Sequence, residues 1–301
     1  MNSNPSHLRH GFFNIDKPIG LTSMDVVREL RKEIKTKKIG HGGTLDPLAT
    51  GVLPIAIGNA TRLLEYLLND SKTYVAEIEI GKSTNTYDSE GEFSKKLPYK
   101  HITKSSIENE LIKFLGIIDQ TPPIYSAIKK DGVRMYQFAR QGIHVEIPSR
   151  KVEVTKLELE NFAPPYLTIK IKCSKGFYVR SFANDLGTKI GTGAYLKSLN
   201  RIQAGDMIIE NSISLKSLNE ELKQENYSRL ITNLDSVLNH MEKKQLTEDE
   251  SIKLKYGQKI HHDSLITEDQ LIKVFDHNNI FFGIAEFIHQ ENILKPVKMF
   301  I

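Results

Sequence analysis

Hydrophobic positions recur at every second residue in two segments, which predicts two strands with one buried face. One segment runs from Tyr74 to Ile80 and the other from Leu167 to Cys173. Residues 11–16 form a shorter apolar run that ends at a turn with proline and glycine. A third strand is therefore expected there.

Helices are predicted where hydrophobic residues recur at intervals of three and four. The first begins at Thr22 or Ser23, where Asp25 is placed to complete a capping box. Its apolar face comprises Val26, Val27, Leu30 and Ile34. Further helices are expected at 60–68, at 105–115 before Gly116, directly after Arg180, and at 230–234.

The end of the chain has a different pattern. Residues 211–250 are polar and rich in charge, and hydrophobic residues then gather at 271–275 and 280–285, on either side of a turn. This pattern is typical of a β-hairpin, and a final strand is expected at 297–300. A small all-β module is therefore predicted to end the chain.

Composition excludes several classes of protein. Hydrophobic residues make up 39% and charged residues 26% of the 301, as in ordinary globular proteins. No apolar run approaches the roughly 20 residues that span a bilayer, and residues 1–10 lack the apolar core of a signal peptide. Cys173 is the only cysteine, which excludes an intrachain disulfide and a cysteine-built metal site. We therefore expect a cytoplasmic protein.

The net charge of +4 says little about partners, but its distribution is informative. Basic side chains gather at 28–38, 129–151 and 172–201, whereas acidic residues prevail at 211–250. Such clusters would suit a phosphate-binding face, although a solvated, lysine-rich surface would look the same. Charge alone does not decide between these interpretations.

Few residues are arranged for familiar chemistry. His261 and His262 are adjacent, so on a strand they would point to opposite faces, and no carboxylate is spaced to supplement them. The sequence also lacks a phosphate-cradling GxxxxGK[ST] loop and a GxSxG elbow. We therefore expect neither a metal nor a cofactor, and carboxylates in glycine-rich surroundings remain the best candidates.

Asp46 lies in such a segment, GHGGTLDPLATG at residues 40–51. The glycines permit tight turns and close approach of the backbone to a ligand, and Pro47 biases Asp46 away from the helical conformation. An aspartate before a proline is also a favoured helix start. From the residues alone, a catalytic carboxylate and a helix cap are both open.

Four sequence blocks, in the same order, make the chain resemble the bacterial tRNA pseudouridine-55 synthases. They are FNIDKPIGLTS at 13–23, GHGGTLDPLATG at 40–51, PPIYSAIK at 122–129 and CSKGFYVRS at 173–181. The third block continues with matches at Gly132, Tyr136, Ala139, Arg140 and Gly142. The resemblance covers roughly residues 11–205.

The resemblance implies an α+β fold with two domains. Residues 11–235 would form a pseudouridine synthase catalytic domain with a mixed, mainly antiparallel sheet, in which 121–150 is an arm that clamps RNA. Residues 246–301 would form a small PUA-like β-barrel that binds RNA.

The resemblance also implies a reaction. A uridine at position 55, in the T-loop of tRNA, would flip out of its stack and become pseudouridine without a cofactor or a metal. Asp46 would be the nucleophile, Arg180 would pair with it and lower its pKa by about 1–3 units, and Tyr74 would stack on the base and assist proton transfer. The substrate-binding residues would be His41, Tyr178, Leu199 and Lys17, the last as a phosphate contact.

The expected partner is the T-arm of tRNA, bound by a monomer. Three alternatives remain: a synthase guided by a separate RNA, an RNA-binding or RNA-folding protein without required chemistry, and a carboxylate glycosidase. The arm segment at 121–142 favours the stand-alone synthase over the guided one. A glycosidase would need a second acid near Asp46, and the sequence nominates none.

Overall fold

The computed structural model describes residues 10–125, 129–130, 133–135, 147–224, 227–262 and 267–300. Strands of the large sheet are β1 (Gly11–Lys17), β2 (Ile39–His41), β3 (Ala49–Ile57), β4 (Lys72–Ile80), β5 (Gly116–Gln120), β8 (Arg150–Ala163), β9 (Tyr166–Cys173), β10 (Ala194–Ala204), β11 (Met207–Ile208) and β12 (Ile213–Ser214). Strands β6 (Lys129–Lys130) and β7 (Val133–Arg134) pair with each other.

The α-helices of the described residues are α1 (Ser23–Ile34), α2 (Leu64–Asn69), α3 (Lys104–Ile112), α5 (Val179–Lys189), α6 (Leu215–Lys223) and α7 (Glu248–Lys255). The 3-10 helices are η1 (Gly58–Leu63), η2 (Ile209–Asn211), η3 (Tyr227–Leu230), η4 (Leu234–Val237) and η5 (His289–Glu291). Helix α1 has the expected capping box between Thr22 and Asp25. The helix predicted at 60–68 is instead a 3-10 turn followed by α2.

The large sheet is mixed and mainly antiparallel. Its main path runs β12-β1-β3-β10-β4-β9-β8-β5. The pairs β1–β12 and β3–β10 are parallel and the other pairs are antiparallel. The predicted α+β class with a mixed sheet is therefore confirmed.

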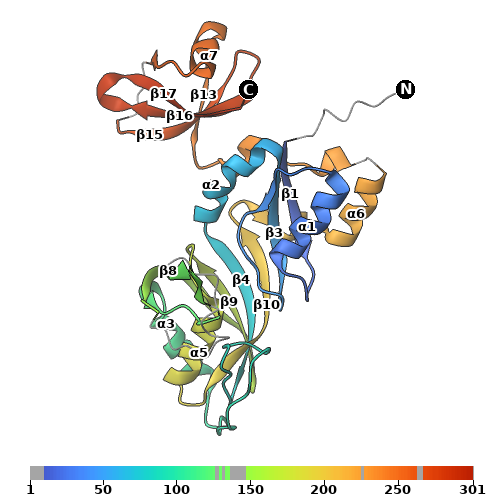
Figure 1. The fold of residues 1–301 in the computed structure, drawn as a ribbon. Helices are drawn as coiled ribbons and strands as arrows, with labels where there is room; N and C mark the ends of the chain where they lie inside the picture. Colours follow the sequence, from blue (N-terminus) through green and yellow to red (C-terminus); the bar gives the residue numbers. More distant parts are fainter. Residues whose placement is uncertain are drawn as a thin grey trace.

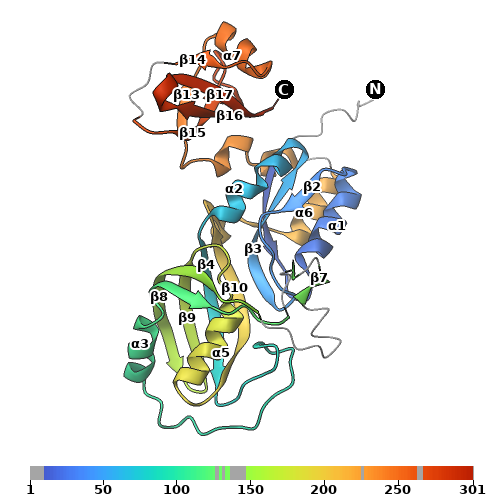
Figure 2. The same cartoon turned by 60° about the vertical axis from the view of Figure 1, so that its left-hand side comes forward.

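Strands β4 and β10 join two halves of this sheet (Figure 2). Helices α3 and α5 cover one half and build the first hydrophobic core with β8 and β9. Helices α1 and α6 cover the other half and build a second core with β1 and β3. Tyr74 on β4 and Leu199 on β10 pack against both cores, so they mark the boundary between the halves.

The C-terminal sheet lies at one end of the molecule, beyond α2 (Figure 1). It contains β13 (Glu242–Gln245), β14 (Ile260–His261), β15 (Gln270–Phe275), β16 (Phe281–Ile288) and β17 (Ile293–Met299) in the order β13-β15-β16-β17-β14. The sheet curls like half of a barrel but its edge strands do not pair with each other. The predicted hairpin corresponds to β15 and β16.

Specific contacts hold this sheet against the part of the chain that carries the large sheet. Ile284 and Phe300 join a core cluster with Phe12 and α2. Arg62 donates to the carbonyl of Met299 at 2.7 Å and places its guanidinium 5.0 Å from the centre of the Phe300 ring. The C-terminal sheet is therefore packed against the part of the chain that carries the large sheet, and is not joined to it by the connecting segment alone.

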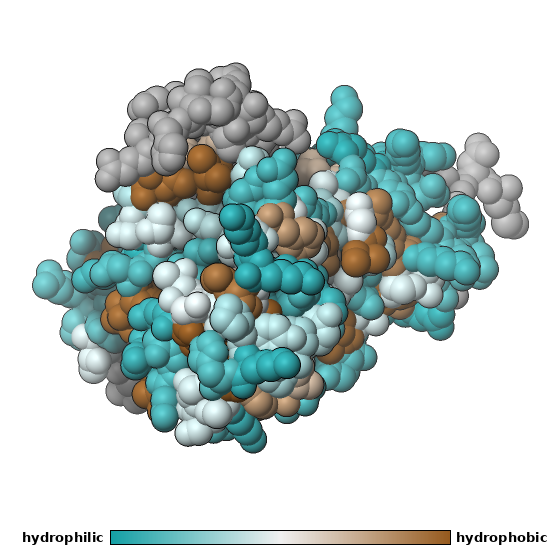
Figure 3. Space-filling model, turned by 90° about the horizontal axis from the view of Figure 1, so that it is seen from below, coloured by the Kyte–Doolittle hydropathy of each residue, from teal (hydrophilic) through white to brown (hydrophobic). Residues whose placement is uncertain are grey.

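The face of the large domain farthest from the C-terminal sheet is chiefly hydrophilic (Figure 3). Hydrophobic residues on this face form small, separate groups rather than one broad patch. Scattered apolar residues of this kind are normal on a water-exposed surface.

Gly51 on β3 provides a test of how tightly β3 packs against β10. Its φ of +98° is strained for other residues, and a Cβ there would collide with the Asn200 side chain and the Arg201 carbonyl. Gly116, with φ +84° and no neighbour within 4 Å of a Cβ, is a matched control. We expect Gly116→Ala to cost about 1–2 kcal/mol, and Gly51→Ala to cost clearly more than about 3 kcal/mol.

Urea denaturation of both variants measures the difference in the free energy of unfolding. Equal losses at the two positions would show that β10 yields to the added methyl group at little cost.

Candidate active site

A cavity of about 650 Å³ opens beside the boundary between the two halves of the large sheet. Its walls come from the loop 43–47, from β4 and β10, and from the segment 174–180 that leads into α5. Five of the seven expected site residues line it, namely Asp46, Tyr74, Tyr178, Arg180 and Leu199.

Asp46 does not cap a helix. From Pro47 the chain passes through a turn, in which the Ala49 N–H donates to the Asp46 carbonyl at 3.0 Å, and enters β3 directly. On the other side, the Leu45 N–H donates to the Ser23 hydroxyl of α1 at 2.8 Å. The loop is therefore anchored on both sides of Asp46, and the helix-cap interpretation is wrong.

Arg180 holds two carboxylates at once. Its Nη2 lies 2.9 Å from Asp46 Oδ2, and its Nη1 lies 3.2 Å from Asp88 Oδ2. Nη2 also donates to the Tyr125 carbonyl at 3.0 Å. The Arg180 side chain is only 8% exposed, whereas 39% of Asp46 is exposed, so a ligand in the cavity can reach Asp46 but not the arginine's far side.

The surroundings shift the proton equilibrium of Asp46. Burial raises the pKa of Asp46 above its ordinary value, and the Arg180 cation opposes this shift, while the nearby Asp88 adds to it. Arg180 therefore acts in the expected direction. The pKa of Asp46 is nevertheless raised on balance, because loss of water around the carboxylate outweighs the attraction of Arg180.

Tyr74 lies over a second buried arginine. Arg201, only 1% exposed, donates from Nε to the Val52 carbonyl at 2.7 Å and from Nη2 to the Gly43 carbonyl at 3.1 Å. Its charge also acts on the nearby Tyr74 phenol. Burial raises the pKa of Tyr74, and Arg201 opposes that shift. One cation thus links the Asp46 loop, β3 and the cavity tyrosine.

Tyr178 and Leu199 both contribute to the wall. The backbone of Tyr178 is fixed by Gln120, whose side chain accepts from its N–H at 2.7 Å and donates to its carbonyl at 3.0 Å. The Arg150 guanidinium lies 4.8 Å from the centre of the Tyr178 ring. Leu199 adds an apolar surface between the two cores.

His41 and Lys17 lie outside the cavity lining. His41 is half-buried on β2, and burial lowers its pKa, so the neutral ring is favoured. Lys17 is fully buried, and its Nζ donates to the carbonyls of Pro18 and Leu21 at 2.8 and 2.6 Å. Burial lowers the pKa of Lys17 to about 8. This buried position corrects the expected phosphate contact. Lys17 instead stabilises the turn that follows β1, through its hydrogen bonds to two carbonyls of that turn.

Much of the expected arm lies outside the described residues, namely 126–128, 131–132 and 136–146. Its described start contacts the site, because the carbonyl of Thr121 accepts from the Ser181 hydroxyl at 2.8 Å, and that of Tyr125 from Arg180.

Among the described residues, no group of three or more His, Cys, Asp or Glu side chains could hold a metal ion. None of the described helices is long and apolar enough to cross a membrane.

Two family profiles match the chain. One, described as "TruB family pseudouridylate synthase (N terminal domain)", matches residues 31–179, and the other, "Pseudouridine synthase II TruB, C-terminal", matches 243–300. A protein of Dehalococcoides mccartyi named tRNA pseudouridine synthase B is 41% identical over 97% of this chain and 96% of its own length. The chain belongs to the TruB family.

A second relative of the same name, from Clostridium kluyveri, is 39% identical over 97% of this TruB-family chain and 99% of its own length. Two solved structures have TM-scores of 0.75, each covering 98% of this chain and 86% of the other. They are an H/ACA RNP bound to a substrate RNA containing 2'-deoxyuridine and a Cbf5-Nop10-Gar1 complex, at 22% and 24% identity. These two show that the TruB-family chain shares their fold.

Two residues of this TruB-family site were missed in the sequence. Asp88 lies in the loop after β4, where no periodicity or motif singles it out. Arg201 could have been found, because on a strand it shares a face with Leu199, two residues earlier. Two irregularities in the pairing of β10 with β4 interrupt the alternation that would have revealed that strand.

The shared arginine predicts opposite pKa shifts for two variants of the TruB-family chain. Arg180→Gln removes the cation and should raise the pKa of Asp46 further, whereas Asp88→Asn removes the second anion and should lower it. The acid limb of activity should move to higher pH in the first variant and to lower pH in the second. NMR titration of the Asp46 carboxyl carbon, assigned with Asp46→Asn, measures both shifts without relying on activity. Shifts of the same sign would contradict this account.

Arg201 is expected to act by positioning the loop and Tyr74. Arg201→Met leaves the buried carbonyls of Gly43 and Val52 without donors, at about 1–3 kcal/mol each. Arg201→Lys keeps the charge but not the forked geometry. Both variants should lose kcat by on the order of 10²-fold with little change in KM, and the methionine variant should lose more stability. A full kcat in Arg201→Lys would reduce this role to charge alone.

Proposed function

We propose that this chain converts the uridine at position 55, in the T-loop of tRNA, into pseudouridine. The observation that carries the proposal is the Asp46–Arg180 ion pair, which presents a reachable carboxylate to a cavity that also holds Tyr74. Membership of the TruB family and the relatives named tRNA pseudouridine synthase B support the substrate and the reaction.

The reaction needs few groups. The bond between ribose C1′ and base N1 breaks, the base turns, and C5 bonds to C1′; C5 then loses a proton and N1 gains one. The atoms balance without an oxidant, a reductant or a second substrate. What the enzyme must supply is a carboxylate that bonds to the substrate or stabilises a cationic sugar, as in glycosidases. We assign this role to Asp46.

The remaining cavity residues divide the other tasks. Arg180 holds the Asp46 carboxylate in place and favours its ionised form against the effect of burial. Tyr74 would stack on the uracil ring, and its hydroxyl would assist transfer of the C5 proton by passing on its own proton as it accepts the one from C5. Leu199 and Tyr178 would bound the turning base and keep water from the intermediate.

The uridine must leave its stack to reach the cavity, at a cost of a few kcal/mol. His41, near the cavity on β2, keeps its proposed place beside the flipped nucleotide, and its favoured neutral ring can lie against a base. Arg150 and Lys175 are basic side chains in the cavity lining and are suited to contact the backbone of the T-arm. The arm at 121–150 would close over the RNA, and the PUA-like unit at 246–301 would add a further contact.

We further propose that the protein acts as a monomer in the cytoplasm. The cavity is assembled from residues of a single chain, so one copy suffices for catalysis. A tRNA-modifying enzyme of bacteria meets its substrate in the cytoplasm.

Among the described residues that line the cavity, Asp46 is the only acid, so the glycosidase alternative lacks a second acid there. Asp88 is a second carboxylate near Asp46, but its side chain is only 3% exposed. Its Oδ1 accepts from the Thr86 hydroxyl at 2.5 Å and from the Glu90 N–H at 3.1 Å, and its Oδ2 pairs with Arg180. A carboxylate engaged in this way does not protonate a leaving group in the cavity.

Replacement of Asp46 by asparagine tests the proposal. Asp46→Asn should lower the rate of pseudouridine formation in a tRNA transcript by at least about 10⁴-fold, with tRNA affinity close to wild type. Because the pKa of Asp46 is raised in the folded state, its contribution to stability is complete below the unfolded pKa of about 3.9 and is lost as pH rises through the folded pKa. Asp46→Asn should therefore melt at the same or a higher temperature at pH 7.

Asp185→Asn is the matched control, because burial also raises the pKa of Asp185 but this residue does not line the cavity. It should retain full activity. Mapping of pseudouridine along the transcript, without any guide RNA, gives the site and the rate. Modification by Asp46→Asn would refute the assigned nucleophile, and a wild type that modifies tRNA only with a guide would favour the guided alternative. A wild type that binds tRNA but never modifies it would favour an RNA-binding or RNA-folding role.

A further inference from the structure

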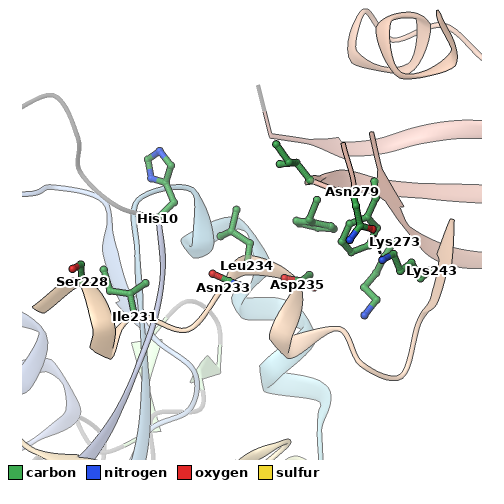
Figure 4. A pocket seen from close by; sticks show the side chains of 12 residues that line it. His10, Ser228, Ile231, Asn233, Leu234, Asp235, Lys243, Lys273 and Asn279 are labelled. Carbon is green, nitrogen blue, oxygen red and sulfur yellow. Dashed lines mark hydrogen bonds between the residues drawn. The ribbon is translucent and has the colours of Figure 1, made fainter. Parts of the chain in front are cut away.

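A second cavity, of about 750 Å³, lies between the catalytic part and the C-terminal sheet. Figure 4 shows Asn233, Leu234 and Asp235 on one side of it, and Lys243, Lys273 and Asn279 on the other. None of its lining residues lines the Asp46 cavity. A group bound here is therefore not the uridine that reacts.

Two lysines stand side by side in this wall. Strands β13 and β15 are parallel, and their register places Lys243 directly beside Lys273. Residues paired in this way point to the same face of a sheet, and both lysines line the cavity. Like charges in adjacent positions destabilise a sheet unless an anion lies between them, so the pair is a candidate site for an anion.

Lys273 has no partner of opposite charge among the described residues. The residue is 8% exposed, and within the described part of the chain its ammonium group forms no hydrogen bond or ion pair. Its neighbours across the sheet are Lys243 and Ile284, neither of which offers a negative charge. The ammonium nitrogen is not among the buried polar atoms that lack a partner, so it keeps contact with water at the cavity surface and is able to bind an anion there.

The other cavity residues fit the rest of a nucleotide. The ammonium of Lys243 donates to Asn279 Oδ1 and lies 4.3 Å from the centre of the Phe275 ring. Phe281, Ile280 and Phe275 provide an apolar and aromatic surface, and Ile280 is 60% exposed. Bases stack on such surfaces without regard to sequence.

The opposite wall sets the polarity of the cavity. Asp235 is the one carboxylate among the described lining residues, and Asn233, Ser228 and His10 add further polar groups. Asp235 forms no ion pair with either lysine within the described structure. Two ammonium groups therefore face a single separate carboxylate, which leaves the lysine side able to receive a phosphate.

We propose that this cavity binds a phosphate and the adjoining base of substrate RNA, at a nucleotide outside the T-arm. The inference rests on the proposed function, since it assumes that tRNA is the substrate. It adds a second point of attachment, formed jointly by the catalytic part and the C-terminal sheet. A tRNA that reaches both cavities is held in register before its uridine flips.

The test uses the full chain with Lys273→Met and Lys243→Met, alone and together. Methionine keeps an apolar stem of similar length and removes the charge, so the fold should persist. The Kd for complete tRNA should rise by about 10-fold in the double variant, and the slope of log K against log salt should fall by roughly 0.7–0.9 for each phosphate that the variant no longer neutralises. The kcat, and the Kd for a hairpin of the T-arm alone, should stay at wild-type values.

Lys244→Met is the matched control, because Lys244 lies on the same strand but next to Val274, on the opposite face. It should leave the Kd for tRNA unchanged. The inference is overturned if Lys244→Met weakens binding as much as the cavity variants, if the hairpin and the complete tRNA lose affinity equally, or if neither loses any. A melting curve at equal protein concentration confirms that each variant is folded.

Free nucleotides could offer the same phosphate chemistry, and a separate measurement distinguishes them. Inorganic phosphate and adenosine monophosphate are added to wild type and to the double variant, and thermal stability is followed. Stabilisation of wild type alone, with unchanged tRNA affinity in the variant, would mean that the cavity takes a free nucleotide and would overturn the RNA assignment. Because these readouts measure binding, they are independent of whether wild type forms pseudouridine, which tests the proposed function separately.

Discussion

One guanidinium shared by two carboxylates organises the candidate active site. Arg180 comes from α5, which belongs to the first core, whereas Asp46 comes from a loop fastened to α1 in the second core. Asp88 supplies the other anion from the loop after β4. The ion pair therefore spans the boundary between the two halves. Removal of Arg180 would leave the buried Asp88 without its cation, which is the costly way to break such a pair. Removal of Asp46 leaves Arg180 still paired with Asp88.

Arg201, which also lines the cavity, is a second buried cation. Arg201 has backbone carbonyls as partners, and no described carboxylate forms an ion pair with it. Burial lowers the pKa of both Lys17 and His41, and the charge of Arg201 adds to these shifts. A buried positive charge beside the cavity would attract a phosphate-bearing substrate. Two arginines thus hold the Asp46 segment, one that pairs with its carboxylate and one that fixes its loop.

Local patterns in the sequence predicted the elements whose hydrophobic spacing is regular. Strands β1, β4 and β9 and the capped helix α1 follow from alternation and capping alone. Strand β8 was missed because many of its residues are exposed, and β10 because bulges interrupt it. For Asp46, the residues alone left both a catalytic carboxylate and a helix cap open until the family motifs were considered. The partner Asp88 and the direction of the Asp46 pKa shift depend on tertiary packing, which no local pattern encodes.

The sharing of Arg180 has a chemical consequence for the nucleophile. If the guanidinium paired with Asp46 alone, the tight ion pair would hold the carboxylate against Arg180 and reduce its reactivity. Asp88 is buried and fully hydrogen-bonded, so it competes for the same cation without competing for substrate. Burial, and to a lesser extent Asp88, raise the pKa of Asp46, while one contact to Arg180 fixes the direction of its carboxylate. In the proposed reaction a carboxylate of higher pKa is a stronger nucleophile once ionised. The second carboxylate would therefore tune the first, although of the two only Asp46 lines the cavity.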